Sequence, residues 1–180
     1  MGVALFHARA GTYGNGLEIA RRVKGVAPGT TGVRGGAHPT IRPEAALAED
    51  CVDFVVAGPG DRALPSLVAH LLEGAGTLVD IPGLGWDDGA VHLNLRDELP
   101  SPDDLPAPAR DLFPTEFYRD KWNVLTATGS CPYRCPFCPA ASIRQARRRR
   151  RRPPGTAAAL REPSATPGAA PRLCPPGRLR

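Results

Sequence analysis

The sequence lacks any apolar run long enough to cross a membrane, since its longest hydrophobic stretches are short and broken by charge or glycine. It therefore predicts neither a membrane span nor a signal peptide. Cysteine is also scarce, with five residues in the chain. Three of them are clustered, which does not fit a disulfide framework and indicates a reducing compartment. We expect a cytoplasmic protein with no membrane partner.

An excess of basic residues is absent from most of the chain. The formal net charge is +5, but residues 1–143 hold 12 Lys and Arg against 17 Asp and Glu. Residues 144–180 hold 11 Arg and one acidic residue, so the basic balance belongs to this segment. Nothing before residue 144 predicts a phosphate-binding surface, and nucleic-acid binding would rest on the C-terminal segment alone.

Residues 144–180 contain no lysine, no aromatic residue and few large aliphatic residues. An unbroken run of six arginines at 147–152 is followed by seven prolines. Such a segment cannot bury enough apolar surface to offset its conformational entropy, so we predict a disordered tail. One interpretation is an arm that binds RNA or an acidic partner. We favour another interpretation, in which the tail is encoded by DNA that is read out of frame after a frameshift near residue 144. Arginine, proline, alanine and glycine all have GC-rich codons, and GC-rich DNA read out of frame gives this mixture.

Residues 1–77 alternate between short apolar runs and amphipathic segments. We expect strands at 3–6, 30–34 and 52–57, and helices at 17–26, 43–48 and 63–72. Strands separated by helices of this length predict an α/β fold with a parallel sheet. The Gly-rich strand-to-helix loops would then share one sheet edge, where ligands bind. The spacing of Gly11, Gly14 and Gly16 is not the dinucleotide fingerprint, and we expect a loop there.

Residues 78–121 are predicted to be a connector. Residues 81–95 indicate a β-hairpin with its turn at Asp88-Gly89. Five prolines between residues 100 and 114 predict an extended linker. We expect Trp86 to be a packing residue and His92 to lie at the surface.

Three cysteines occur at x3 and x2 spacing in Cys131-Pro-Tyr-Arg-Cys135-Pro-Phe-Cys138, directly after a strand-like run at 122–128. Three thiolates this close together can bind one metal centre. A closed structural site uses four protein ligands, whereas three leave one position open. The alternative is a structural zinc site whose fourth ligand is Cys174 or a histidine.

This CxxxCxxC loop resembles the cluster loop of radical S-adenosylmethionine (SAM) enzymes. The resemblance implies a 4Fe-4S cluster bound by Cys131, Cys135 and Cys138, with SAM on the open iron and Phe137 as a SAM contact. It also implies reductive cleavage of SAM to a 5'-deoxyadenosyl radical, a small-molecule substrate, and an electron donor such as flavodoxin or ferredoxin. Residues 122–143 would begin a partial TIM-like barrel. No catalytic residue of the chain itself is assigned.

The N-terminal part resembles B12-binding-domain radical SAM proteins over residues 3–143. The shared motifs are Gly35-Gly36-Ala-His38-Pro39-Thr40, Val52–Val56, Gly58-Pro-Gly60-Asp61, Ile81–Leu84 and Leu105–Asp111. The resemblance implies a partial flavodoxin-like (Rossmann-like) cobalamin-binding domain at 1–77, with Gly35 and Gly36 along the nucleotide tail and His38 as a further contact. From its position alone, His38 would be an ordinary loop histidine.

Two departures from that family bear on cobalamin binding. The chain has no Asp-x-His-x-x-Gly loop, and it has Pro59 and Asp61 where the family has glutamates. We also expect it to begin at the third strand of the family domain, which would leave three strands and an exposed edge. Cobalamin binding by this chain should therefore be weak or absent.

The sequence thus predicts a truncated, inactive fragment of a cobalamin-dependent radical SAM enzyme, either a methyltransferase or a cyclase, whose substrate-binding part is missing. Two alternatives remain: a non-catalytic cofactor-binding fragment with a structural zinc site, and a nucleic-acid-binding protein that uses its Arg-rich tail.

Overall fold

The computed structural model describes residues 2–7, 10–96, 100–101, 103–106, 136, 138 and 143. The chain divides into two compact units, and all helices and strands below belong to the first. Of the second unit the structure describes residues 100–101 and 103–106, where the Asp104 amide donates a hydrogen bond to Ser101 O (3.0 Å). No helix within the described ranges is long and apolar enough to span a membrane.

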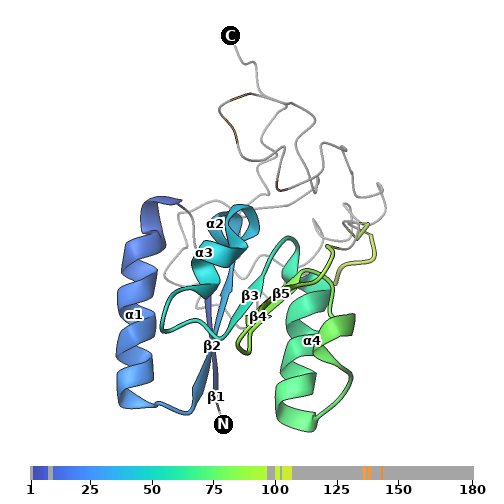
Figure 1. Ribbon diagram of the computed structural model, residues 1–180. Helices are drawn as coiled ribbons and strands as arrows, with labels where there is room; N and C mark the ends of the chain where they lie inside the picture. The colour runs from blue at the N-terminus through green and yellow to red at the C-terminus, as the bar shows by residue number, and fades with distance from the viewer. Residues whose placement is uncertain are drawn as a thin grey trace, which may run out of the picture. The chain divides into compact units, whose positions relative to one another are not determined.

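The first unit is built on a five-stranded sheet in the order β1-β2-β3-β4-β5 (Figure 1). Its strands are β1 (Gly2–His7), β2 (Thr30–Gly35), β3 (Phe54–Val56), β4 (Leu84–Asp87) and β5 (Val91–Leu93). The first three are parallel, and β4 and β5 are antiparallel to their neighbours. The three parallel strands and β5 therefore end at the same sheet edge, and β4 alone among these five runs the other way.

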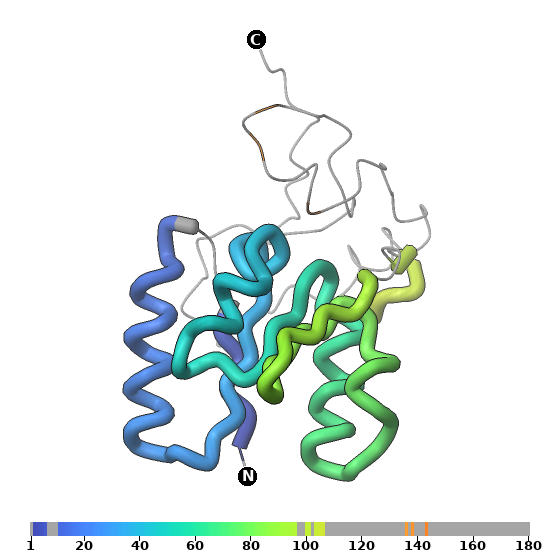
Figure 2. Tube along the Cα trace, viewed as in Figure 1, coloured from blue at the N-terminus to red at the C-terminus, as the bar shows by residue number. Residues whose placement is uncertain are grey.

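Helices cover both faces of this sheet. They are α1 (Tyr13–Val26), α2 (Ala37–Ile41), α3 (Pro43–Leu47) and α4 (Gly60–Glu73), with 3₁₀ turns η1 (Ala10–Thr12) and η2 (Leu78–Asp80). In Figure 2 the chain runs from β2 through α2 and α3 to β3, and α1 and α4 lie on opposite sides of the sheet. An α/β layer architecture results, as predicted.

Two apolar clusters hold the layers together. One packs α1 and α3 on the sheet through Leu17, Leu47 and Val55. The other packs α4 on the opposite face through Leu67, Val33 and the buried Trp86. Val55 in the first cluster and Leu67 in the second are fully buried, so each face of the sheet has its own apolar core.

The hairpin forms where it was predicted, but the number of strands in the sheet and the start of α1 differ from the expectation. The hairpin forms with Gly89 at its turn, and it extends the sheet on β3, so the predicted reduction to three strands is wrong. A loop was expected at Gly11–Gly16, but helix α1 already begins at Tyr13. A Cβ on Gly16 would lie 3.0 Å from Arg34 Nη2, so glycine there allows the helix to approach β2 closely.

Residues 37–41 form α2 where a loop was expected. Gly36 turns the chain with φ 103°, and the Thr40 amide then donates to Gly36 O at 3.2 Å. A glycine is needed because side-chain-bearing residues rarely adopt this backbone conformation. The predicted domain boundaries, the barrel start at 122–143 and the disordered tail lie largely or wholly outside the described residues and stay predictions.

Candidate functional site

The candidate site lies where β2 and β3 end and the chain turns into helices (Figure 1). Gly35 is the last residue of β2 and Gly36 follows it, and Gly58-Pro59-Gly60 leads from β3 into α4. Gly35 lies opposite Val56 in the parallel register, so both loops leave the same edge of the sheet. The carboxyl ends of parallel strands are where α/β folds bind their ligands.

Thr40 of α2 connects the two glycine loops. Its Oγ1 donates a hydrogen bond to Gly36 O (2.7 Å) and accepts one from Gly58 N (2.9 Å). The side chain is 3% exposed, so the hydroxyl satisfies backbone groups that water reaches poorly. The sequence indicated no role for Thr40. Its spacing of four residues from Gly36 is the one signal that could have suggested this link.

His38, the predicted cobalamin contact, lies on α2 against Tyr13 of α1. The two ring centroids are 3.9 Å apart. His38 Nδ1 is buried and has no hydrogen-bond partner among the described residues. The structure therefore brings Gly35, Gly36 and His38 to one edge, while their role in binding stays a prediction.

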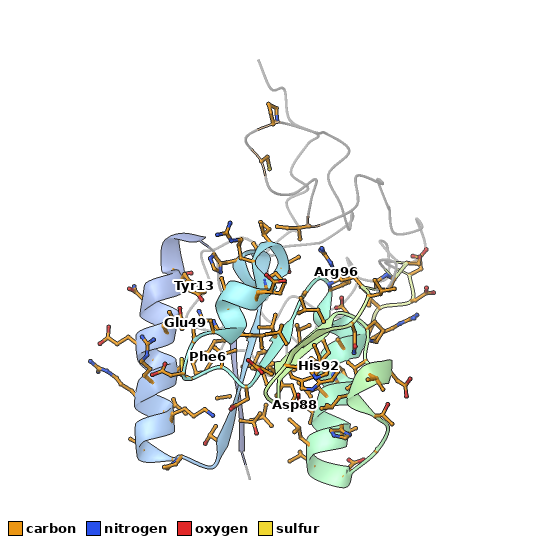
Figure 3. All side chains as sticks on the ribbon, in the orientation of Figure 1. Phe6, Tyr13, Glu49, Asp88, His92 and Arg96 are labelled. Carbon is orange, nitrogen blue, oxygen red and sulfur yellow. The ribbon has the colours of Figure 1, made fainter. Side chains whose placement is uncertain are left out.

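Tyr13 and Arg34 form a cluster beside His38 that the sequence did not reveal. Arg34 lies on β2 and is completely buried, with its guanidinium carbon 4.6 Å from the Tyr13 ring centroid. Tyr13 OH donates a hydrogen bond to Glu49 Oε1 at 3.3 Å (Figure 3). Burial, followed by the charge of Glu49, raises the pKa of Tyr13 above its ordinary value, so the phenol is neutral at physiological pH. These contacts join distant segments, which residue periodicity cannot predict.

The glycine edge has room for a bound group. A Cβ on Gly35 would meet only Val56 O, at 3.8 Å, and one on Gly60 would meet only Val56 Cγ1, also at 3.8 Å. These are ordinary van der Waals distances, so packing among the described residues requires glycine at neither position. The missing side chains leave the backbone open to a ligand. At Gly35 and Gly60 the edge is therefore compatible with a ligand such as cobalamin held against the backbone, whereas a Cβ on Gly58 would lie 3.2 Å from Arg96 Cδ.

Most of the predicted cluster loop lies outside the described residues, including Cys131, Cys135 and Phe137. Cys138 is described and is a free, half-buried thiol. Within the described part of the chain, no group of three or more His, Cys, Asp or Glu side chains could hold a metal ion. Cys51 is buried in the α1 layer, and burial raises the pKa of its thiol, as expected for a core residue. The cluster ligands stay a prediction from spacing.

Comparison with known proteins gives no match to a protein-family model and none to a curated protein. Solved structures do match. The cobalamin-dependent S-adenosylmethionine radical enzyme OxsB, solved with aqua-cobalamin and S-adenosylmethionine bound, aligns with a TM-score of 0.74 at 18% identity. The radical S-adenosylmethionine methyltransferase TsrM from Kitasatospora setae, solved with cobalamin and a 4Fe-4S cluster, aligns with a TM-score of 0.64 at 19% identity.

Both alignments cover 88% of this chain, but only 22% of OxsB and 34% of TsrM. The chain thus spans between about a fifth and a third of the length of these enzymes. Identity this low shows the fold alone. The fold implied by the motifs between Gly35 and Asp61 is confirmed: this chain is similar in structure to part of cobalamin-dependent radical SAM enzymes.

Proposed function

We propose that this chain is a fragment of a cobalamin-dependent radical SAM enzyme and that residues 2–96 form part of its cobalamin-binding domain. The observation that supports this most strongly is the pair of glycine loops joined by Thr40 at the carboxyl edge of the parallel strands. In a fold similar to OxsB and TsrM, an open backbone edge is suited to a large ligand.

Within that site, Gly35 and Gly36 would line the nucleotide tail of cobalamin, and His38 would contact the same ligand. The second loop contributes less, because Pro59 has no backbone N–H to donate. When bound, cobalamin supplies a cobalt centre that can carry a methyl group. The protein's own part is to hold the ligand against the backbone and to keep water from the edge.

Cys131, Cys135 and Cys138 would bind a 4Fe-4S cluster whose open iron takes SAM beside Phe137. When bound, the cluster supplies the electron that cleaves the sulfonium of SAM. The electron would come from a donor such as flavodoxin or ferredoxin, and the substrate would be a small molecule. Thiolate-bound clusters need a reducing environment, so we place the protein in the cytoplasm.

Cobalamin binding by this chain alone should be weak but measurable. The expectation that it could be absent rested on a three-stranded sheet and on the missing Asp-x-His-x-x-Gly loop, but the sheet has five strands. Weakness follows from Pro59 and from β1, which pairs only with β2 among the described strands.

The test is a titration with hydroxocobalamin, followed by the absorbance of the corrinoid, on wild type, Gly35→Val and Gly29→Val. Gly35→Val fills the open edge, so Kd should rise at least ~10-fold, or about 1.4 kcal/mol. Gly29 has no heavy atom within 4 Å of its Cβ position and precedes β2 at the other end of the strand, so Gly29→Val is the matched control and should bind as wild type. Folded wild type that binds no cobalamin, or Gly35→Val that binds equally well, would contradict the proposal.

A further inference from the structure

The side chain of Arg34 has an unusual position for a charged group. It is 0% exposed and lies between β2 and the first turn of α1. Its Nη2 donates a long hydrogen bond of 3.3 Å to the backbone oxygen of Tyr13, and a Cβ on Gly16 would come within 3.0 Å of the same atom. The guanidinium is therefore enclosed by the start of the helix.

No anion among the described residues compensates this charge. Arg34 Nε and Nη1 are buried and have no hydrogen-bond partner, although they carry three of the five guanidinium N–H donors. Glu49 reaches the cluster, but its carboxylate accepts from Tyr13 OH and from Arg21 Nη2. A buried charge without a partner is strongly unfavourable.

The start of α1 adds to the same imbalance. Its first turn contains no acidic residue that would balance the charge of Arg34. The amino end of a helix has partial positive charge and unpaired N–H groups. Two positive groups thus meet at one place, Arg34 and the amino end of α1, and together they favour an anion.

We propose that Arg34 and the first turn of α1 bind a phosphate group. Guanidinium groups and helix amino ends both donate charge-assisted hydrogen bonds to phosphate oxygens. Tyr13 is partly exposed, and its ring lies over the guanidinium and against the ring of His38, so the Tyr13 ring would move aside to admit the ligand. Charge counting along the sequence missed this site because a count does not distinguish the buried Arg34 from exposed arginines.

The phosphate could be a free ion or the phosphodiester of a larger ligand bound at the neighbouring glycine edge. Binding of inorganic phosphate is independent of the proposed function, because it is measured without corrinoid. Only the second source involves cobalamin, whose nucleotide tail contains a phosphodiester that cobinamide lacks.

The experiment measures thermal unfolding of the full chain in phosphate-free buffer and in about 50 mM inorganic phosphate at matched ionic strength. Wild type should unfold at a higher temperature in phosphate. Arg34→Met should lose this rise and be at least as stable as wild type without phosphate, because the unpaired charge is gone. Arg22→Met removes an exposed arginine from the same helix as Tyr13 and should keep the rise.

Cobalamin and cobinamide titrations then identify the source. If the phosphodiester is the ligand, Arg34→Met raises Kd for cobalamin about 10-fold and leaves cobinamide unchanged. If free phosphate is the ligand, neither corrinoid is affected while the thermal shift is still lost. If Arg34→Met does not fold, the ³¹P line broadening of inorganic phosphate by wild type and by Tyr13→Ala tests the proposal instead. Tyr13→Ala should bind phosphate more strongly, because the ring that covers the guanidinium is removed. No phosphate-specific shift or broadening in wild type, or an equal shift in folded Arg34→Met, would overturn the proposal.

Discussion

At the residue scale, one hydroxyl group fixes the relative position of the two glycine loops. Among the described residues, Gly58 N donates its hydrogen bond to Thr40 Oγ1, whereas Gly36 O accepts from both the Thr40 hydroxyl and the Thr40 amide. Removing the hydroxyl therefore leaves Gly58 N without this acceptor while α2 keeps its own backbone bond. The loop after β3 depends on Thr40 more than the loop after β2 does.

We predict that Thr40→Val lowers the free energy of unfolding by about 1–3 kcal/mol, since it removes the acceptor of a partly buried N–H. Thr40→Ser keeps the hydroxyl and should lose much less. Urea unfolding of the three proteins measures the difference. If Thr40→Val and Thr40→Ser were equally stable, the hydrogen bonds to the loops would not be the cause. Cobalamin binding should weaken in Thr40→Val, because the edge is less ordered.

At the element scale, the β4–β5 hairpin completes the sheet and closes the second apolar cluster. Trp86 is buried from β4, and the ring of His92 on β5 stacks on it with centroids 4.7 Å apart. Asp88 Oδ1 lies 2.9 Å from His92 Nε2 across the turn (Figure 3). The hydrogen bond to His92 lowers the pKa of Asp88 below its ordinary value.

A lowered folded-state pKa means that the Asp88 interaction stabilises the protein above the unfolded pKa of about 3.9. That contribution is lost as the pH falls through the lower folded pKa. We predict that Asp88→Asn is slightly less stable than wild type at neutral pH and that the two midpoints converge in acid. Thermal unfolding of both proteins from about pH 2 to about pH 7, a range that includes the ordinary pKa of Asp, measures the difference between their midpoints. A difference that does not change with pH would show that the charge of Asp88 does not matter.

Local features of the sequence were sufficient to predict the strands and most helices. The apolar run at 52–57 and the amphipathic pattern at 17–26 are signals that lie within a few residues. The attachment of the hairpin to β3 is a long-range pairing, and no local signal specifies it. The glycines at the start of α1 led to an incorrect loop prediction. Gly16 allows the helix to pack closely against Arg34, a contact that exists only in the folded chain.

The candidate site was predicted in the same uneven way. Gly35, Gly36 and His38 were predicted as ligand contacts because they are adjacent in a recognisable motif, and the structure places them at one edge. Arg34 is next to them, yet its burial depends on Tyr13, which lies 21 residues away in the chain. Side-chain hydrogen bonds such as those of Thr40 and Glu49 likewise join elements that approach only in three dimensions.

At the scale of the whole molecule, the two proposed cofactors would be held by different segments of the chain. Cobalamin would bind at the glycine edge of the parallel strands, whereas the cluster would bind at Cys131, Cys135 and Cys138.

The most direct test of the radical SAM assignment is the metal content of the protein after anaerobic reconstitution with iron and sulfide. We predict iron at cluster stoichiometry and a broad absorbance near ~400 nm, as for thiolate-bound iron–sulfur clusters. Alanine at Cys131, Cys135 or Cys138 should abolish both signals, and Cys51→Ala should retain them because Cys51 lies in the apolar core. One zinc ion per chain with no iron would contradict the assignment and favour a structural zinc site.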